Sequence, residues 1–166
     1  MAALVNSITQ NLQGVVSKEM IVFIISMMPV LELRGGLLAA SILNVPYIKA
    51  LIICVIGNLI PIPFVLFFIE KIVIALEKFG PTKRIAMMLR NKVEKNRESI
   101  EKYDFWGLVL FVGIPLPGTG AWTGSLVAGL LHMKRRKAVP AILTGVVMAS
   151  VIMSIVSYGI LGNVIR

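Results

Sequence analysis

The sequence of 166 residues is poor in charge, because Asp, Glu, Lys and Arg make up only 15% of it while hydrophobic residues make up 57%. Its mean hydropathy is +0.89. A soluble domain needs more polar side chains than this to cover its surface. The composition therefore excludes a soluble enzyme and a disordered chain, and it predicts an all-α integral membrane protein with a single membrane domain over residues 1–166.

Residues that carry catalytic or ligand chemistry are scarce as well. Cys54 and His132 are each the only one of their kind, so no intrachain disulfide and no metal-ligand spacing is possible. Ser, His and Asp do not cluster, and no nucleotide-binding loop occurs. We expect no enzymatic activity, no cofactor and no metal. The net charge of +9 does not indicate a nucleic-acid partner, because 13 of the 17 Lys and Arg residues lie within 71–102 and 134–137 instead of over one exposed face.

Two stretches of the chain are long and apolar enough to cross a membrane as a helix, which takes about 20 residues. They are residues 50–69 and 138–165, and neither contains a charge. Two further apolar stretches, 20–48 and 105–133, are interrupted near their centres by proline and glycine. Proline removes a backbone donor and glycine releases the chain from helical geometry. We therefore expect each interrupted stretch to form two half-helices.

Charge placement indicates how these half-helices are oriented. Basic residues flank the stretch 105–133 at both ends, and the positive-inside rule assigns both ends to the cytoplasmic side. A re-entrant hairpin satisfies this rule, whereas a single crossing does not. The stretch 20–48 has only Lys18 and Lys49 at its ends, as expected for a hairpin that enters from outside. The hairpin breaks are predicted at Pro29, Pro115 and Pro117.

An internal repeat supports two hairpins of opposite orientation. A shift of 88 positions aligns residues 23–58 with 111–146 without a gap and gives nine identities, including Pro29 with Pro117 and Gly57 with Gly145. Each half would be a re-entrant hairpin followed by a transmembrane helix, which is the inverted-topology repeat typical of secondary transporters. The predicted segments are an interfacial amphipathic helix over 1–17, repeat 1 over 20–69, a cytoplasmic amphipathic segment over 70–104 and repeat 2 over 105–165.

Glu32 and Arg34 are the only charged residues inside the apolar stretches, and ionisable groups at membrane depth usually face a cavity or each other. One hypothesis is a buried ion pair that pins the hairpin tip. The other is a binding site, in which Glu32 carries a proton and Arg34 grips a phosphate or carboxylate. Helix N-termini that follow the glycines would add N–H donors for an anion. The candidate substrate-binding or ion-binding residues are Glu32, Arg34, Gly35, Gly36, Gly118, Thr119, Gly120, Trp122 and Thr123.

Two motifs carry a family resemblance. Glu32-Leu-Arg-Gly and Ile114-Pro-Leu-Pro-Gly-Thr-Gly-Ala-Trp-Thr-Gly124 resemble the prokaryotic small multidrug export protein family, a distant relative of the DedA/SNARE-associated-Golgi (VTT) superfamily. The resemblance covers nearly the whole chain. It implies paired re-entrant hairpins in a multi-pass protein of a prokaryotic cell membrane. Through the DedA relatives it also implies ion-driven translocation of a lipid or a polyprenyl phosphate.

Three functions stay open from the sequence. The favoured one is a proton-coupled transporter or flippase for an anionic lipid-linked substrate such as a polyprenyl phosphate or phospholipid, because Arg34 and two helix N-termini accompany a single carboxylate. The alternatives are an exporter of small cationic drugs and a non-transporting membrane scaffold. The expected partners are membrane lipids, a small-molecule or lipid-phosphate substrate, protons or another coupling ion, and a second copy of the chain in a homodimer.

Overall fold

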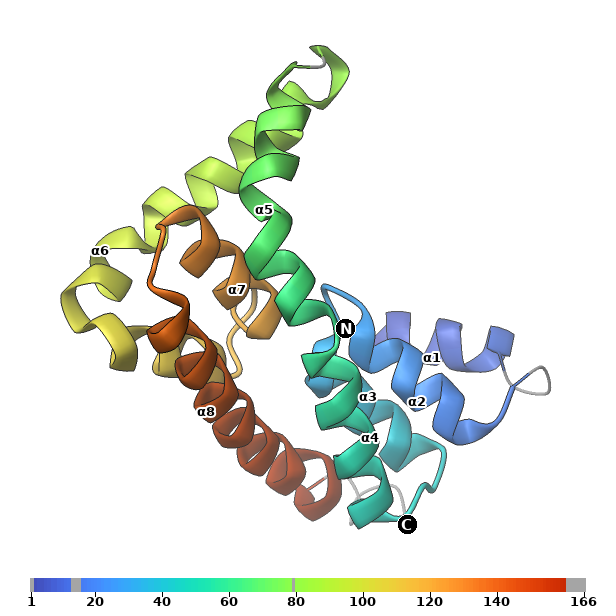
Figure 1. Ribbon diagram of the computed structural model, residues 1–166. Helices are drawn as coiled ribbons and strands as arrows, with labels where there is room; N and C mark the ends of the chain where they lie inside the picture. Colours follow the sequence, from blue (N-terminus) through green and yellow to red (C-terminus); the bar gives the residue numbers. More distant parts are fainter. Residues whose placement is uncertain (1, 13–15, 79, 161–166) are drawn as a thin grey trace.

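The computed structural model describes residues 2–12, 16–78 and 80–160, which form helices joined by short connections and contain no strand (Figure 1). Two short helices, η1 (Gly80–Thr82) and η2 (Ile155–Ile160), have 3-10 and π geometry. The α-helices are α1 (Ala2–Leu12), α2 (Lys18–Met27), α3 (Glu32–Ile42), α4 (Tyr47–Leu59), α5 (Pro61–Lys78), α6 (Lys83–Gly113), α7 (Ala121–Leu130) and α8 (Arg135–Ser154).

The first half of the fold is a pair of short helices, α2 and α3, packed against α4. Ser17 caps α2 by accepting a hydrogen bond from the N–H of Met20 at 3.3 Å, as serine commonly does at a helix start. The helix ends at Met27, and the predicted break at Pro29 lies in the four-residue connection before α3. We call α2 and α3 the first hairpin.

In the second half of the fold, the end of α6 and the short helix α7 pack against each other and against α8. α6 contains a sharp kink at Asp104, whose φ of 46° and ψ of −115° are not helical. Lys137 at the start of α8 forms an ion pair with the Asp104 side chain. The part of α6 after the kink and α7 form the second hairpin, and Pro115 and Pro117 lie in the connection between them.

Backbone geometry matches between the halves at the same spacing of 88 residues. α4 begins at residue 47 and α8 at residue 135. The residue after α3, Leu43, has φ −80° and ψ 0°, and its counterpart Leu131 after α7 has φ −83° and ψ 3°. The next residues, Asn44 and His132, have positive φ angles of 55° and 54°. Positive φ is uncommon for residues other than glycine, so the coincidence is specific.

Two helical segments are long and apolar enough to cross a membrane: Tyr47–Lys78, which comprises α4 and α5, and Arg135–Tyr158, which comprises α8 and part of η2. The first extends beyond the predicted apolar stretch at both ends and the second at its start, because Lys49, Glu70 and Lys137 bound the apolar runs but lie within the helices. α5 begins at Pro61, and proline suits the first position of a helix. Of the predicted span 138–165, residues 161–165 lie outside the described residues.

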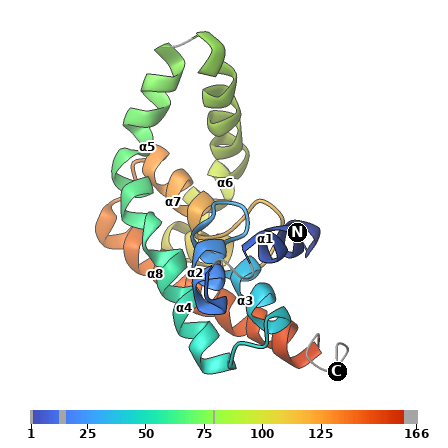
Figure 2. The same ribbon diagram turned by 90° about the vertical axis from the view of Figure 1, so that its right-hand side faces the viewer.

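Two peripheral elements differ from simple surface helices. Val5 of α1 is fully buried and Ile8 packs against the main core, so the apolar face of the predicted interfacial helix is turned at least partly toward the protein. The end of α5 and the first part of α6 lie side by side and form an arm that extends away from the other helices (Figures 1 and 2). This arm contains most of the predicted amphipathic segment 70–104.

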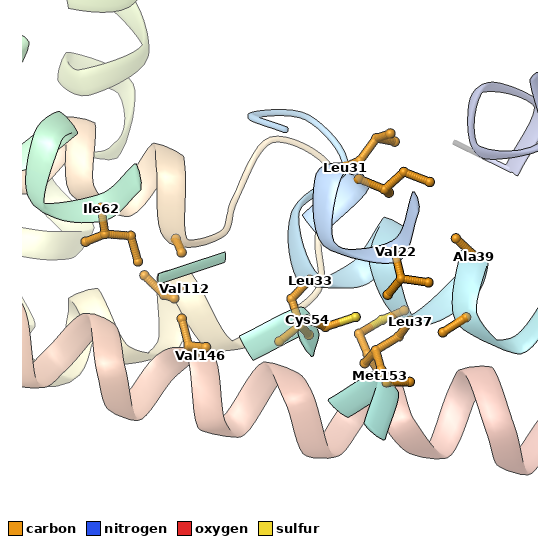
Figure 3. Packing of buried hydrophobic residues seen from close by; sticks show 14 of the residues in the cluster. Val22, Leu31, Leu33, Leu37, Ala39, Cys54, Ile62, Val112, Val146 and Met153 are labelled. Carbon is orange, nitrogen blue, oxygen red and sulfur yellow. The ribbon is translucent and has the colours of Figure 1, made fainter. Parts of the chain in front are cut away.

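The main core joins both halves through α8 (Figure 3). Near the C-terminal end of α8, Met153 lies near Leu37 of the first hairpin, and in the middle of α8, Val146 lies near Val112 of the second. Glycine makes the helix contacts close, because a Cβ on Gly145 would lie 2.6 Å from Val112 Cβ. The fold thus holds the two hairpins against one scaffold and brings their connections together.

Candidate functional site

The two hairpin connections meet, and we call the contact between residues 27–34 and 114–123 the junction. Prolines in both connections cannot continue a helix, and Gly118 and Gly120 have positive φ angles of 83° and 124°. These residues turn the chain sharply, so that α3 and α7 begin close to each other. Glu32 and Arg34 lie in the first turn of α3 and are 4% and 6% exposed.

Glu32 caps the helix that begins in the other half of the chain. The N–H of Ala121 donates to Glu32 Oε2 at 3.1 Å, and the N–H of Trp122 donates to Oε1 at 3.0 Å. These N–H groups lie in the first turn of α7, where no carbonyl within the helix can accept from them. The positive end of the helix dipole also favours a carboxylate there. The buried charge of Glu32 is therefore stabilised by a helix 89 residues away in sequence.

Gly120 is the residue that lets the carboxylate approach. Its φ of 124° and ψ of −173° belong to a region that only glycine adopts readily. A Cβ at this position would lie 2.0 Å from Glu32 Oε2. Gly120 is therefore required by both its backbone conformation and its contact with Glu32.

Arg34 holds the connection before α7. Its Nη1 donates to the carbonyl of Leu116 at 2.7 Å, and its Nη2 donates to the carbonyl of Ile114 at 3.3 Å and to Thr119 Oγ1 at 3.1 Å. The Thr119 hydroxyl lies 2.9 Å from both carbonyl oxygens and completes the network. The planar guanidinium thus gathers three oxygens of the second hairpin, and only a side chain with several donors in a fixed plane can do so.

Trp122 makes a third link between the hairpins. Its indole Nε1 donates at 3.1 Å to the carbonyl of Met27, the last residue of α2. Carbonyls at a helix end lack partners within the helix, so this bond satisfies one of them. The ring is half-buried against the apolar cluster that includes Val65 and Ile69 of α5. Trp122 therefore acts here as a packing residue and as a hydrogen-bond donor.

Five of the predicted site residues line one small pocket at the junction, with a volume of about 140 Å³. This is below the roughly 300 Å³ at which pockets begin to hold drug-sized ligands, and it has room for about four waters or a small ion. Its lining residues are Glu32, Arg34, Gly118, Thr119 and Thr123, together with Pro29, Val30 and Pro117.

The other predicted site residues have different surroundings. A Cβ on Gly36 would lie 2.0 Å from Ser26 Oγ and 2.8 Å from Cys54 Sγ, so this glycine allows α3 to pack closely on α2 and α4. A Cβ on Gly35 would lie 2.6 Å from the Cβ of Leu31. Gly35, Gly36 and Pro115 do not line the pocket. They shape the hairpins that carry it.

The electrostatics of the junction favour a link between the hairpins. The carboxylate and the guanidinium both bond to the opposite hairpin, so each buried charge has hydrogen-bonding partners, as buried charges require. Hydrogen bonds to charged groups contribute about 1.5–3 kcal/mol each. Within the described residues, no group of three or more His, Cys, Asp or Glu side chains could hold a metal ion. A carboxylate such as that of Glu32 can take up a proton, and a guanidinium such as that of Arg34 can bind an anion.

The site residues predicted from the sequence do not include one buried polar residue. Asn58, in the last turn of α4, is 3% exposed, and its Oδ1 has no hydrogen-bond partner within the part of the chain that the structure describes. The sequence feature that could have indicated it is a single amide side chain inside the apolar stretch 50–69, next to Gly57. We predicted this segment only as a membrane-crossing helix, without a role in binding.

Comparison with known proteins gives one kind of match. A family model described as "Putative small multi-drug export protein" matches residues 32–152, which is well over half of the chain. The matched range begins at Glu32 and contains all of the second hairpin. Neither the curated proteins nor the solved structures gave a match.

Proposed function

The chain belongs to the small multi-drug export protein family, and from this premise we propose that it is a multi-pass transporter of a prokaryotic cell membrane whose path opens at the junction. Two apolar helical segments long enough to cross a bilayer support the membrane setting. The observation that carries the proposal is the pair of opposite charges, Glu32 and Arg34, each bound to the other hairpin beside one pocket.

The proposed architecture is an inverted repeat of a re-entrant hairpin plus a transmembrane helix. Support comes from the matching φ angles of Asn44 and His132 and the matching helix starts of α4 and α8, all 88 residues apart. The basic residues on both sides of the second hairpin support opposite orientations, because they favour the cytoplasmic side. In this arrangement the two hairpins meet from opposite faces of the bilayer.

The junction would open when its charged groups exchange partners. A proton on Glu32 removes the negative charge that accepts from the N–H groups of Ala121 and Trp122, and so weakens the start of α7. An anionic group can replace the oxygens of Leu116 and Thr119 at the guanidinium of Arg34, since guanidinium binds phosphate and carboxylate bidentately. We therefore propose a proton-coupled cycle with an anionic, lipid-linked substrate. The relationship to the DedA superfamily stays a prediction.

Export of small cationic drugs is the second candidate, and the description of the family favours it. In that case a cation would compete with the α7 N-terminus for the carboxylate of Glu32, and Arg34 would serve only to hold the second hairpin. The two candidates differ in the sign of the substrate charge and in the residue on which binding depends.

The test is ligand binding to purified protein in nanodiscs, with a polyprenyl phosphate and a quaternary ammonium compound as probes. Each is measured at about pH 5.5 and about pH 8, so that binding linked to a proton differs between the two conditions. We expect tighter polyprenyl phosphate binding at the lower pH, no pH dependence in Glu32→Gln, and no binding in Arg34→Ala. Lys49→Gln, which removes an exposed charge far from the junction in sequence, is the control and should behave like the unmodified protein.

Tighter quaternary ammonium binding at the higher pH, lost in Glu32→Gln and unchanged in Arg34→Ala, would contradict the anionic substrate and support the second candidate. If neither probe binds and both variants only lower stability, the scaffold alternative is favoured. Each outcome separates one of the three functions from the other two.

A further inference from the structure

A groove runs between α5 and α8, away from the junction. It consists of an apolar pocket of about 280 Å³ and a polar pocket of about 210 Å³, which are adjacent because Leu66 and Phe67 line both. In Figure 1, α4 and α8 approach each other near the C-terminal end of α8 and diverge toward its start, where α7 lies between α8 and α5. The groove occupies this diverging side.

The groove as a whole matches one leaflet of a bilayer in length. Its apolar part is lined by aliphatic, aromatic and proline side chains, from Leu59 to Phe67 on one wall and from Val139 to Leu143 on the other. From Leu59 to Glu70 the chain advances 11 residues, or about 16 Å of helix at 1.5 Å per residue. Half of the hydrocarbon core of a bilayer is about 15 Å thick. An extended acyl chain therefore fits along the groove.

The polar end of the groove carries charges of both signs. Glu70 lies 3.8 Å from His132 Nδ1, and the two side chains are 54% and 70% exposed. The guanidinium of Arg135 lies over the ring of Phe67, 4.3 Å from its centroid, which is a cation–π contact. Lys134 and Arg136 flank Arg135 in sequence. A headgroup at this end would meet a cationic group and a carboxylate side by side.

We propose that this groove binds a phospholipid whose headgroup contains both a phosphate and an ammonium group. One acyl chain lies along the apolar part, the phosphate contacts Arg135 and the ammonium contacts Glu70. Long basic side chains at the membrane surface bind lipid phosphates readily. This site is separate from the junction and does not depend on what the protein transports.

Charge complementarity selects this occupant over simpler amphiphiles. A quaternary ammonium detergent would be attracted by Glu70 but repelled by Arg135. An anionic lipid without an amine would bind Arg135 and leave Glu70 facing a phosphate. Only a headgroup with both charges pairs with both side chains.

The experiment measures lipid binding to the purified protein by native mass spectrometry. The probes are dioleoyl phosphatidylethanolamine, dioleoyl phosphatidylglycerol and dodecyltrimethylammonium. Arg135→Gln should weaken phosphatidylethanolamine binding about tenfold, as expected for loss of one charge-assisted hydrogen bond. Arg136→Gln is its matched control, because this neighbouring basic residue is exposed and does not line the groove. Glu70→Gln should abolish the preference for phosphatidylethanolamine over phosphatidylglycerol.

A second pair of variants tests the position of the acyl chain. Leu143→Trp fills the apolar part of the groove and should weaken binding of both lipids. Val151→Trp adds the same bulk on the same helix, at a residue that is 56% exposed and lies outside the groove, and should leave binding unchanged. Equal effects of Arg135→Gln and Arg136→Gln, or unchanged binding in Leu143→Trp, would overturn the proposal. So would dodecyltrimethylammonium binding more tightly than either lipid and depending on Glu70.

Discussion

Replacing Gly120 by alanine tests the cap that joins the hairpins. The change forces alanine into the conformation with φ 124° and ψ −173°, which costs about 1–3 kcal/mol for a residue with a Cβ. The added methyl group would lie 2.0 Å from Glu32 Oε2 and 2.7 Å from Cδ, so the carboxylate must leave the start of α7. Loss of its hydrogen bonds adds about 2 kcal/mol.

The expected total for Gly120→Ala is about 3–5 kcal/mol of unfolding free energy, a large part of the roughly 5–15 kcal/mol that stabilises a typical domain. The assay is equilibrium unfolding in mixed micelles with increasing sodium dodecyl sulfate, followed by the fluorescence of Trp106 and Trp122. Gly80→Ala is the control, because a Cβ there meets no atom within 4 Å and its effect should stay below about 0.5 kcal/mol.

A double-mutant cycle separates the two parts of this effect. In a Glu32→Ala background the methyl group of Ala at position 120 no longer meets a carboxylate, so only the backbone strain is left. We expect the effect of Gly120→Ala to fall by about 2 kcal/mol in that background, which is a coupling of the size seen for residues in contact. Equal effects in both backgrounds would refute the steric conflict between the methyl group and Glu32.

Three further predictions concern single contacts. Arg34→Lys should lower the unfolding free energy by about 2 kcal/mol in the same assay, because an ammonium group cannot reproduce the three bonds of the guanidinium plane; an unchanged value would contradict this geometry. Gly36→Ala should destabilise by about 1–3 kcal/mol through overpacking, and Ser26→Ala, which removes the nearest atom, should restore part of the loss in thermal melts. The hydrogen bond from Lys49 lowers the pKa of Glu19 below its ordinary value of 4.5, so the pair stabilises the fold at neutral pH and this contribution is lost as the pH falls through the lowered pKa. Lys49→Gln should raise the pKa of Glu19 in a ¹³C NMR titration, and an unaltered titration would exclude the pairing in solution.

Much of the helical plan could be predicted from the sequence, because it depends on local signals. Pro29 and Pro117 mark both connections, and the helices that follow begin at Glu32 and Ala121. The two long apolar segments were also found, although their ends were not. A run of apolar residues stops at the first charge, whereas a helix continues through Lys137 or Glu70 when its backbone bonds are made.

The contacts at the junction could not be read from local signals. Glu32 and Arg34 are two residues apart, so the sequence favoured either a pair between them or a shared binding site. The structure gives Glu32 the N–H groups at the start of α7 and gives Arg34 the oxygens of the preceding connection. Most of those partners are backbone atoms, which every residue has, so no pattern of side chains in the sequence predicts them.

The cap on α7 also sets an order of events during synthesis. Glu32 leaves the ribosome 89 residues before Ala121, an interval of about 4–18 s at about 5–20 residues per second. During that time neither Glu32 nor Arg34 can have its final partners. Both side chains must then be hydrated or bound to other groups. The junction therefore cannot form before residues 114–122 have been synthesised, and a translational pause before them would lengthen the interval in which Glu32 and Arg34 lack these partners.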